Sequence, residues 1–386
     1  MRTLSTILFL LLFTVGCAGI EYETFEYTSG NFDHDNRLVS ATLQMSDFDG
    51  GVCLEADGNL IPAQVERMTP SRARVWWHSN QSASETVEYS IRTDAECYDS
   101  QYAWVRLDDE SVQLQHNGNP LIQYEHPVFD VNDIEGTKKP FHHVFDPLTD
   151  QLITKGPGGL YSHHRGIFYG YNELRLNDEV FDFWHAVNGE RQEHRNFVKE
   201  MNGPVFGGHV LLIQWLDHND RLILEEERDV RVYRHDENSF IIDLDISTFA
   251  IAGLLRLDGD LHHAGVQFRA AQYVADNADE TYFIRPESVA HVPADVELEE
   301  EDRINLPWNA MNFNVEGSNY TVVYMSNPGN PGRSEMSERK YGRFGEFFPH
   351  QQSEGAPLEI GYRFWVVTGE APTVDEIESM YLEYIQ

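Results

Sequence analysis

The sequence has few cysteines, few basic residues and, after its first residues, no apolar run long enough to cross a membrane. Three of its 386 residues are cysteine, and 64 acidic residues stand against 28 basic ones, which gives a formal net charge of −36. A surface with this charge repels nucleic acid at long range, so we expect no nucleic-acid partner. An anionic sugar is still compatible with this negative surface. Salt screens distant charges, so nearby arginines and histidines determine the electrostatic potential inside a pocket.

The standard nucleotide-binding and serine-hydrolase motifs are also absent. The glycine-rich segment 156–159 is not followed by the Lys-Ser/Thr pair of a phosphate-binding loop. Neither the Gly-x-Gly-x-x-Gly pattern nor the Gly-x-Ser-x-Gly pattern occurs. These absences disfavour ATP, dinucleotide and serine-hydrolase chemistry.

The start of the chain has the layout of a secretory signal. Arg2 gives a basic beginning, residues 7–13 are apolar, and small residues precede Cys17. The apolar run is shorter than the roughly 20 residues that a spanning helix needs. We therefore expect residues 1–16 to be a removed signal peptide and lipid on Cys17 to be the sole membrane attachment, at the periplasmic or outer cell surface. Thr14 replaces the leucine usual in bacterial lipoprotein signals, which weakens lipidation more than export.

Short strand signals separated by turn residues predict a mainly β protein. We expect a small N-terminal β-sandwich domain over 17–112 and a large antiparallel β-sandwich of the super-sandwich type over 113–386. Thr373 and Glu376 have capping-box spacing, which predicts a helix over 374–385. The stronger strand signals cover residues 74–78, 86–91, 209–217, 221–234, 240–246, 282–285, 320–325 and 358–367.

Two cysteines remain after Cys17, at Cys53 and Cys97. In an oxidising compartment they form one disulfide or stay as two buried thiols, and both alternatives are open. Neither has the neighbours of a catalytic thiol, so we assign them no chemistry.

Histidine is the unusual residue, with 17 in the chain. Its side chain suits proton transfer and metal binding near neutral pH. If each adjacent pair lies on a strand, one member faces a given cavity, and His143, His164 and His263 would then suit a divalent metal. The predicted reaction needs no cofactor, and structural histidines are the alternative. The adjacent pairs are His142-His143, His163-His164 and His262-His263.

Other polar residues lie near these histidines in the sequence. The alternation along 263–269 predicts a strand that lines a polar cavity, because its polar residues share one face. The segment 182–185 combines an acid, an aromatic pair suited to sugar stacking and an imidazole. A packed core for those aromatics is the alternative. The residues expected on the two polar strand faces are His263, Gly265, Gln267 and Arg269 on one, and Arg339, Tyr341 and Arg343 on the other.

Five ordered motifs together resemble the PmoA-like family over roughly residues 50 to 370. They are Ser162-His163-His164-Arg165-Gly166, Asp182-Phe183-Trp184-His185, His263 to Arg269, Leu306-Pro307-Trp308-Asn309-Ala310-Met311 and Ser337 to Gly345, with Ile61-Pro62-Ala63-Gln64 as a further match. The resemblance implies a β-rich exported protein of polymer-degrading bacteria, associated with carbohydrate utilisation. Members are often labelled methane oxygenase, which this sequence contradicts, because the membrane oxygenase subunit spans the bilayer several times.

We predict a carbohydrate-active lyase or dehydratase that performs β-elimination on uronate-containing oligosaccharides. Arginines would neutralise the sugar carboxylate, and a histidine or tyrosine would take the adjacent proton. Proton transfer is assigned to His163 or His164 with Tyr171, and His263 is a further catalytic candidate. The substrate-binding candidates are Arg165, Trp184, His185, Gln267, Arg269, Arg339, Tyr341 and Arg343.

Two other functions remain open from the sequence. A glycoside hydrolase would use two carboxylates, from the candidates Asp182, Glu193 and Glu338. A glycan-binding lipoprotein would instead stack Trp184, Trp308 and Tyr341 on sugar rings.

Overall fold

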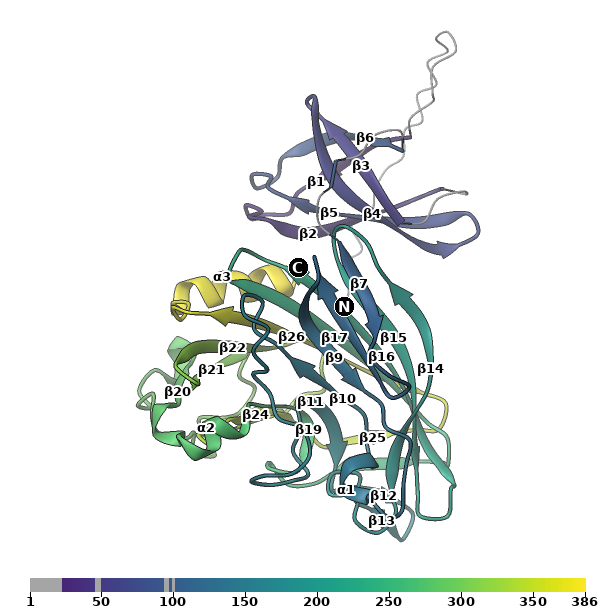
Figure 1. The fold of residues 1–386 in the computed structure, drawn as a ribbon, viewed down its shortest axis with the longest axis vertical. Helices are drawn as coiled ribbons and strands as arrows, with labels where there is room; N and C mark the ends of the chain where they lie inside the picture. The colour runs from purple at the N-terminus through teal and green to yellow at the C-terminus, as the bar shows by residue number, and fades with distance from the viewer. Residues whose placement is uncertain (1–22, 46–49, 94–96, 99–100) are drawn as a thin grey trace.

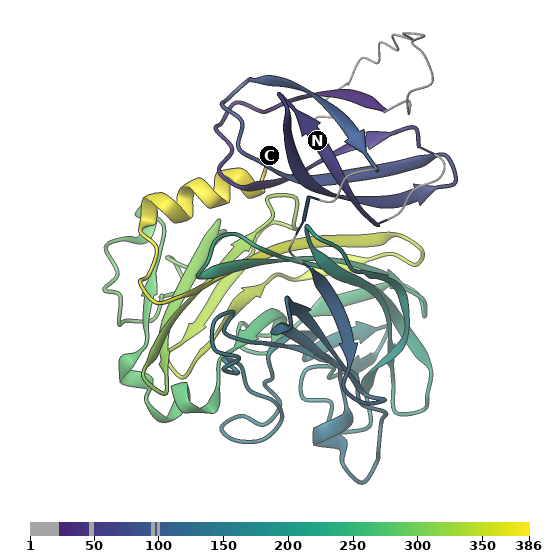
Figure 2. The ribbon, with the colours of Figure 1, turned by 45° about the horizontal axis from the view of Figure 1, so that its top comes forward.

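The computed structural model describes residues 23–45, 50–93, 97–98 and 101–386, which form two β domains (Figures 1 and 2). The predicted signal peptide and Cys17 lie outside the described residues. Within these ranges, no helix has the length and apolar character that crossing a membrane requires.

The small domain is one antiparallel sheet of six strands in the order β1-β6-β3-β4-β5-β2. On β5 the residues Val75 and Trp77 are buried and alternate with half-buried neighbours, as expected for a strand with one face on a core. Rings of Phe25, Tyr27 and Tyr89 surround Trp77 at centroid distances of 4.9–5.6 Å. The strands are β1 (Thr24–Thr28), β2 (Arg37–Leu43), β3 (Gly50–Ala56), β4 (Asn59–Thr69), β5 (Arg72–Ser79) and β6 (Thr86–Arg92).

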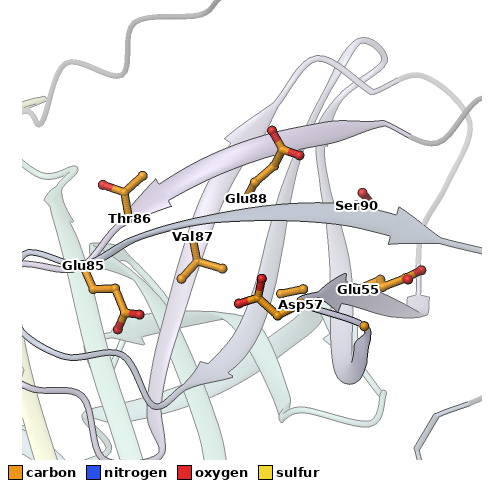
Figure 3. Close-up of a pocket in the computed structure, with 9 residues that line it drawn as sticks. Glu55, Asp57, Glu85, Thr86, Val87, Glu88 and Ser90 are labelled. Atoms are coloured by element: carbon orange, nitrogen blue, oxygen red, sulfur yellow. The ribbon is translucent and has the colours of Figure 1, made fainter. Parts of the chain in front are cut away.

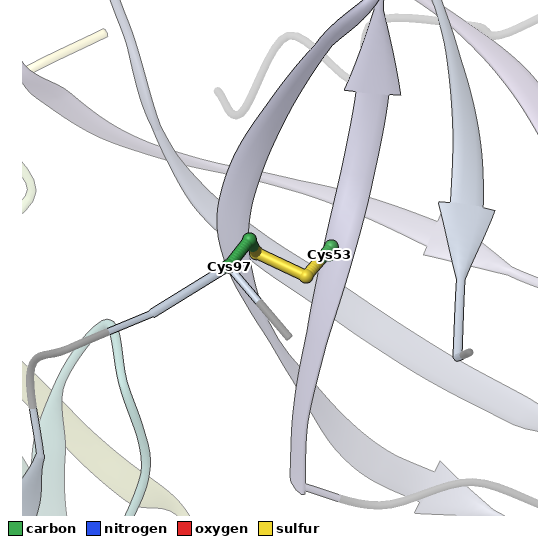
Figure 4. The surroundings of a disulfide bond; sticks show 2 residues. All are labelled: Cys53 and Cys97. Atoms are coloured by element: carbon green, nitrogen blue, oxygen red, sulfur yellow. A yellow bond between two sulfur atoms is a disulfide. The ribbon is translucent and has the colours of Figure 1, made fainter. Parts of the chain in front are cut away.

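A disulfide joins Cys53 on β3 to Cys97 beyond β6, which decides between the two alternatives left by the sequence (Figure 4). It closes a loop with a sequence separation of 44 residues. Loss of such a cross-link releases chain entropy in the unfolded state.

We expect the double variant Cys53→Ala/Cys97→Ala to lower the free energy of unfolding of the small domain by about 3 kcal/mol. Urea unfolding followed by circular dichroism measures the change. A reducing agent should shift the wild type by a similar amount and leave the double variant unmoved. Equal midpoints for the wild type and the variant, both without reductant, would contradict the expectation.

The large domain is a sandwich of two eight-stranded antiparallel sheets, which we call the site sheet and the back sheet. The site sheet contains β7 (Tyr102–Arg106), β8 (Ser111–His116), β9 (Asn119–Glu125), β10 (Phe141–Val144), β11 (Ile167–Tyr171), β19 (Ala264–Arg269), β23 (Glu335–Arg339) and β24 (Arg343–Phe347). The back sheet contains β14 (Arg191–Met201), β15 (Gly207–Leu216), β16 (Leu222–Arg234), β17 (Ser239–Ala250), β20 (Tyr282–Ile284), β21 (Trp308–Val315), β22 (Ser318–Ser326) and β26 (Pro357–Thr368). Side chains from both sheets form one apolar core, so the predicted mainly β architecture is confirmed.

A smaller sheet and a few helical segments complete this domain. Four strands, in the order β13-β12-β18-β25, form the smaller sheet. Their bounds are β12 (Glu173–Leu176), β13 (Glu179–Phe181), β18 (Leu255–Asp258) and β25 (His350–Gln352). The helical segments are α1 (Ile134–Thr137), α2 (Gln272–Asp276), the 3-10 turns η1 (Ala278–Glu280) and η2 (Glu287–Val289), and α3 (Val374–Tyr384).

The boundary between the domains lies earlier than the predicted residue 112. The small sheet ends with β6, and β7 already pairs with β8 in the site sheet. Residues 107–110 are the turn of the β7–β8 hairpin, so this boundary depends on strand pairing that the sequence does not display.

Helix α3 packs where the two domains meet (Figures 1 and 2). Its capping box is formed, with the Thr373 side chain accepting from the backbone of Glu376, so the predicted helix is confirmed. Its buried Ile377 and Met380 join an apolar cluster on the back sheet, against which Leu38 of the small domain also packs. This junction is built on the back sheet.

Alternation along β19 places a polar surface on the outer face of the site sheet. Val266 and Phe268 point into the sandwich core, so Gln267 and Arg269 point outward, as the sequence pattern predicted. On the neighbouring strand Arg343 pairs in register with Arg269. This outer face carries the candidate site.

Candidate functional site

Four histidines gather over the outer face of the site sheet, and we call His163, His164, His185 and His263 the histidine cluster. Ring centroids are 4.3 Å apart for His163 and His164, 4.6 Å for His163 and His185, and 4.8 Å for His185 and His263. They come from three loops that precede β11, follow β13 and precede β19. Neither the 163–164 pair nor the 262–263 pair lies on a strand. The expectation that only one member of each pair faces the cavity therefore does not apply to them.

The loop after β13 lies directly on the site sheet because β11 has a glycine at the contact. A Cβ atom on Gly170 would lie 2.9 Å from the carbonyl oxygen of Phe183, which is closer than real Cβ contacts. The backbone N–H of Phe183 donates to the carbonyl of Tyr171 at 2.9 Å. The buried Lys139 ammonium holds the same loop by donating to the carbonyls of Phe183 and Trp184 at 2.9 and 2.5 Å.

Two members of the histidine cluster are each held by an aspartate. Nδ1 of His185 lies 2.8 Å from Asp182, and Nδ1 of His263 lies 2.8 Å from Asp260. Burial alone would raise the pKa of Asp182 and Asp260, but hydrogen bonds from the histidines reverse the effect and leave both pKa values below normal. Because a carboxylate accepts, each imidazole donates through Nδ1, which leaves Nε2 as the ring nitrogen that can bind a further ligand.

The other two histidines have free ring nitrogens. Nε2 of His163 and both nitrogens of His164 are buried without a hydrogen-bond partner among the described residues. Burial, together with nearby positive charges, lowers the pKa of His163 to about 2 and places that of His164 well below its ordinary value. Both rings are thus uncharged at neutral pH. The His164 ring lies parallel to Tyr341 with centroids 6.2 Å apart.

Three fully buried arginines line the same region. Arg343 is saturated, because it donates to Gln267, Ser337 and the Tyr341 hydroxyl at 2.7, 2.8 and 3.0 Å. Arg269 donates to the Tyr341 carbonyl and stacks over its ring, but its Nε and Nη2 have no partner within the described chain.

Arg165 also has guanidinium nitrogens without a hydrogen-bond partner among the described residues. It donates through Nη2 to Glu135, while its Nε and Nη1 are buried and unpaired as far as the described residues go. Burial lowers the pKa of Arg165 and of Arg269 to about 10, so both stay charged at neutral pH. Buried guanidinium groups with unused N–H donors favour an anionic ligand.

Several roles assigned from the sequence are wrong in this structure. The Tyr171 ring lies in the sandwich core and its hydroxyl faces the Phe348 carbonyl at 3.5 Å, so it cannot pair with His163 or His164. Trp184 is fully buried against Phe141 and Phe168 and offers no exposed face to a sugar.

The structure does not bring together His143, His164 and His263, which the sequence suggested as possible metal ligands. His143 binds the Thr154 hydroxyl at 3.0 Å, and the histidines that converge are instead His163, His185 and His263. The segment that carries His143 is a strand, β10, whereas the other ligands lie on loops whose paths the sequence does not specify.

The remaining candidates lie beside the cluster or away from it. Gln267 and Tyr341 orient Arg343, whereas Arg339 is engaged by Glu297 and His262 at 2.9 and 2.7 Å. The other residues proposed for hydrolysis or stacking are elsewhere: Glu193 pairs with Arg191 and Arg195, Glu338 pairs with Arg285, and Trp308 lies in the core of the back sheet.

Sequence reasoning missed Asp260, Lys139 and Lys155. Asp260 had a usable signal, because it precedes His263 by three residues just as Asp182 precedes His185. Lys155 fixes the loop before β11 by donating to the carbonyls of Gly158, Leu160 and Tyr161.

A separate hollow lies on the small domain and is lined mainly by Glu55, Asp57, Glu85 and Glu88 (Figure 3). It contains no histidine or arginine, and no member of the histidine cluster lines it. It therefore lacks the anion-binding donors of the site sheet.

A family model described as a family of unknown function, DUF6807, matches residues 111–381. The chain belongs to the DUF6807 family. The matched range contains the entire histidine cluster and its aspartates, while the small domain lies outside it. No curated protein matches the chain. Membership in DUF6807 assigns no reaction, and the resemblance to the PmoA-like family stays a prediction.

Proposed function

We propose that the protein is a carbohydrate-active lyase or dehydratase that eliminates across the bond next to the carboxylate of an acidic sugar. The observation that carries the proposal is the buried Arg269, with its unused N–H donors, near the unpaired ring nitrogens of His164. A guanidinium and an imidazole close to each other are the two groups that this elimination needs.

In the proposed reaction Arg269 binds the sugar carboxylate, which stabilises the negative charge that develops when the adjacent carbon loses its proton. His164 takes that proton. The bond from the neighbouring carbon to its oxygen then breaks, a carbon–carbon double bond forms, and the leaving oxygen receives a proton. The Tyr341 hydroxyl supplies this proton, since it accepts from Nε of Arg343 at 3.0 Å and its own hydrogen stays available.

Hydrolysis through two carboxylates is less well supported. The two carboxylates beside the cluster, Asp182 and Asp260, are each engaged by a histidine Nδ1. Glu338 is buried in an ion pair with Arg285, so it offers no second acid to the site. Of the three aromatic residues considered for glycan stacking, Trp184 and Trp308 are fully buried and Tyr341 alone is partly exposed.

The direct test is incubation of the purified protein with a panel of uronate oligosaccharides while ultraviolet absorbance is followed. Elimination is expected to create a conjugated unsaturated product that absorbs there. Silence across the panel with a correctly folded protein would contradict the proposal. New reducing ends without the chromophore would indicate a hydrolase, and tight binding that survives His163→Ala and His164→Ala would indicate a binding protein.

We expect Arg269→Gln to lower kcat/KM by about 100-fold or more, mainly through KM, because the carboxylate loses a buried charged partner. Steady-state kinetics on the best substrate of the panel measures the change. Arg256→Gln is the matched control, because Arg256 is largely exposed on β18 and pairs with Asp258. Equal values for the two variants would exclude Arg269 from substrate binding.

A further inference from the structure

Three histidines of the cluster converge on one point, each with one ring nitrogen. One ring nitrogen from each of His163, His185 and His263 lies within 4.8 Å of the others. Among the described residues, no other group of three or more histidine, cysteine, aspartate or glutamate side chains has this spacing. We propose that these three imidazoles bind one divalent transition-metal ion, of the zinc class, through their Nε2 atoms.

Two of the three proposed ligands have a carboxylate behind them. Asp182 accepts from Nδ1 of His185, and Asp260 accepts from Nδ1 of His263, both at 2.8 Å. This fixes the tautomer that presents a lone pair on Nε2, and carboxylates placed behind histidines in this way are typical of metal sites. Backbone N–H groups of Trp184 and His185 donate to Asp182 at 3.0 and 2.7 Å, so the carboxylate is itself fixed.

The third proposed ligand, His163, has a ring nitrogen without a partner. Nε2 of His163 is buried and has no hydrogen-bond partner in the described part of the chain. A buried polar atom left without a partner destabilises the folded protein, and a metal bond would remove this cost. The His163 ring lies 4.6 Å from that of His185 and 6.1 Å from that of His263, so it closes the third side of the group.

The spacing suits an ion after a small rotation of the rings. Zinc–nitrogen bonds of about 2.0–2.1 Å place the ligand nitrogens of a tetrahedral site roughly 3.3 Å apart. The site now holds its three nitrogens within 4.8 Å, and all three side chains are only partly buried. The two aspartates offset the charge of a divalent ion.

The ligand set also selects the kind of ion and its role. Three neutral imidazoles favour zinc, cobalt, nickel or copper, whereas magnesium and calcium prefer oxygen ligands. Three protein ligands leave a fourth position open, which is the pattern of catalytic and not of structural zinc. If the proposed elimination is correct, an oxygen of the sugar would take that position, and this part alone depends on the proposed function.

The test is metal binding by the full chain, made without a histidine tag and treated with chelator. After loading with Zn²⁺ and removal of the excess, mass spectrometry of the metal content is expected to give one ion per chain. Co²⁺ in its place is expected to give the visible absorption bands of a tetrahedral site. His185→Ala and His263→Ala should abolish stoichiometric binding, with circular dichroism confirming an intact fold.

Two further variants separate a metal site from a merely structural cluster. Asp182→Asn is expected to weaken Zn²⁺ affinity by about 10- to 100-fold while all three ligands remain. His262→Ala is the matched control, since this neighbour of His263 contacts Arg339 and should retain one ion per chain. Absence of a stoichiometric ion in the wild type, or binding unchanged by His185→Ala and His263→Ala, would overturn the proposal.

Failure of the metal proposal is distinguishable from failure of the proposed function. One ion per chain without elimination of any uronate substrate would leave the metal site standing and remove the lyase. Elimination by chelator-treated protein that binds no ion would do the reverse.

Discussion

Replacing His164 by alanine is expected to lower kcat for the elimination by about 10²- to 10⁴-fold, the usual contribution of a positioned general base. KM should change little, because the carboxylate of the substrate would still meet Arg269. Both ring nitrogens of His164 are buried and unpaired, so the side chain has no structural hydrogen bond to lose within the described chain. Initial rates at saturating uronate oligosaccharide measure the effect.

His126→Ala is the matched control for this variant. His126 also has a buried Nε2 without a partner among the described residues, but its ring packs against Tyr124, His194 and Phe197, away from the cluster. We expect its kcat to stay within about 2-fold of the wild type. A His164→Ala enzyme with normal kcat would remove His164 from the role of base.

Replacing Glu338 by alanine is expected to lower the free energy of unfolding by about 3–5 kcal/mol, because it would leave the buried guanidinium of Arg285 without its anion. Glu338 accepts from Nη2 of Arg285 at 2.5 Å, from Asn309 at 2.7 Å and from the backbone of Leu298 at 2.8 Å. No water is available to replace these bonds at a side chain that is 1% exposed. Urea unfolding followed by circular dichroism measures the loss.

Two companion variants identify the cause of that loss. The double variant Arg285→Met/Glu338→Leu should recover much of the stability, because it removes the charge together with its partner. Glu200→Gln breaks the exposed pair between Glu200 and Arg106 and should cost at most about 1 kcal/mol. Equal losses for Glu338→Ala and Glu200→Gln would contradict the structural assignment of Glu338.

Local patterns predicted the elements that depend on neighbouring residues. The capping box at Thr373 gave the position of α3, and alternation along 263–269 gave the polar face of β19. Both follow from periodicity, which the sequence carries directly. The boundary at residue 112 assigned β7 to the small domain, whereas strand pairing, which the sequence does not display, places β7 in the site sheet.

Features that depend on the path of loops were not predictable in the same way. Tyr169 and Tyr171 share the face of β11 that meets the sandwich core, and alternation along a strand does not tell which of its faces that is. Because the two tyrosines face the core, Phe168 and Gly170 lie on the opposite face of β11, beneath the site. Trp184 is buried above them. The sequence therefore supplied most members of the site and misassigned the roles that depend on this choice.

The spacing of three residues between an aspartate and a following histidine was the most informative signal that the sequence-based prediction did not use. Asp182 and Asp260 both precede their histidine by three residues, and both lie in loops where a side chain can turn back on its own segment. A search for repeated Asp-x-x-His would have selected His185 and His263 without knowledge of the fold.

The contact between Gly170 and Phe183 has a thermodynamic consequence for ligand binding. Backbone touches backbone there, and Lys139 holds the carbonyls above it, so the wall that carries Asp182 and His185 is already ordered before a ligand arrives. A ligand at His185 thus loses little free energy to ordering the protein. Alanine at position 170 would make this wall adjustable, and affinity would fall although no residue that touches the ligand had changed.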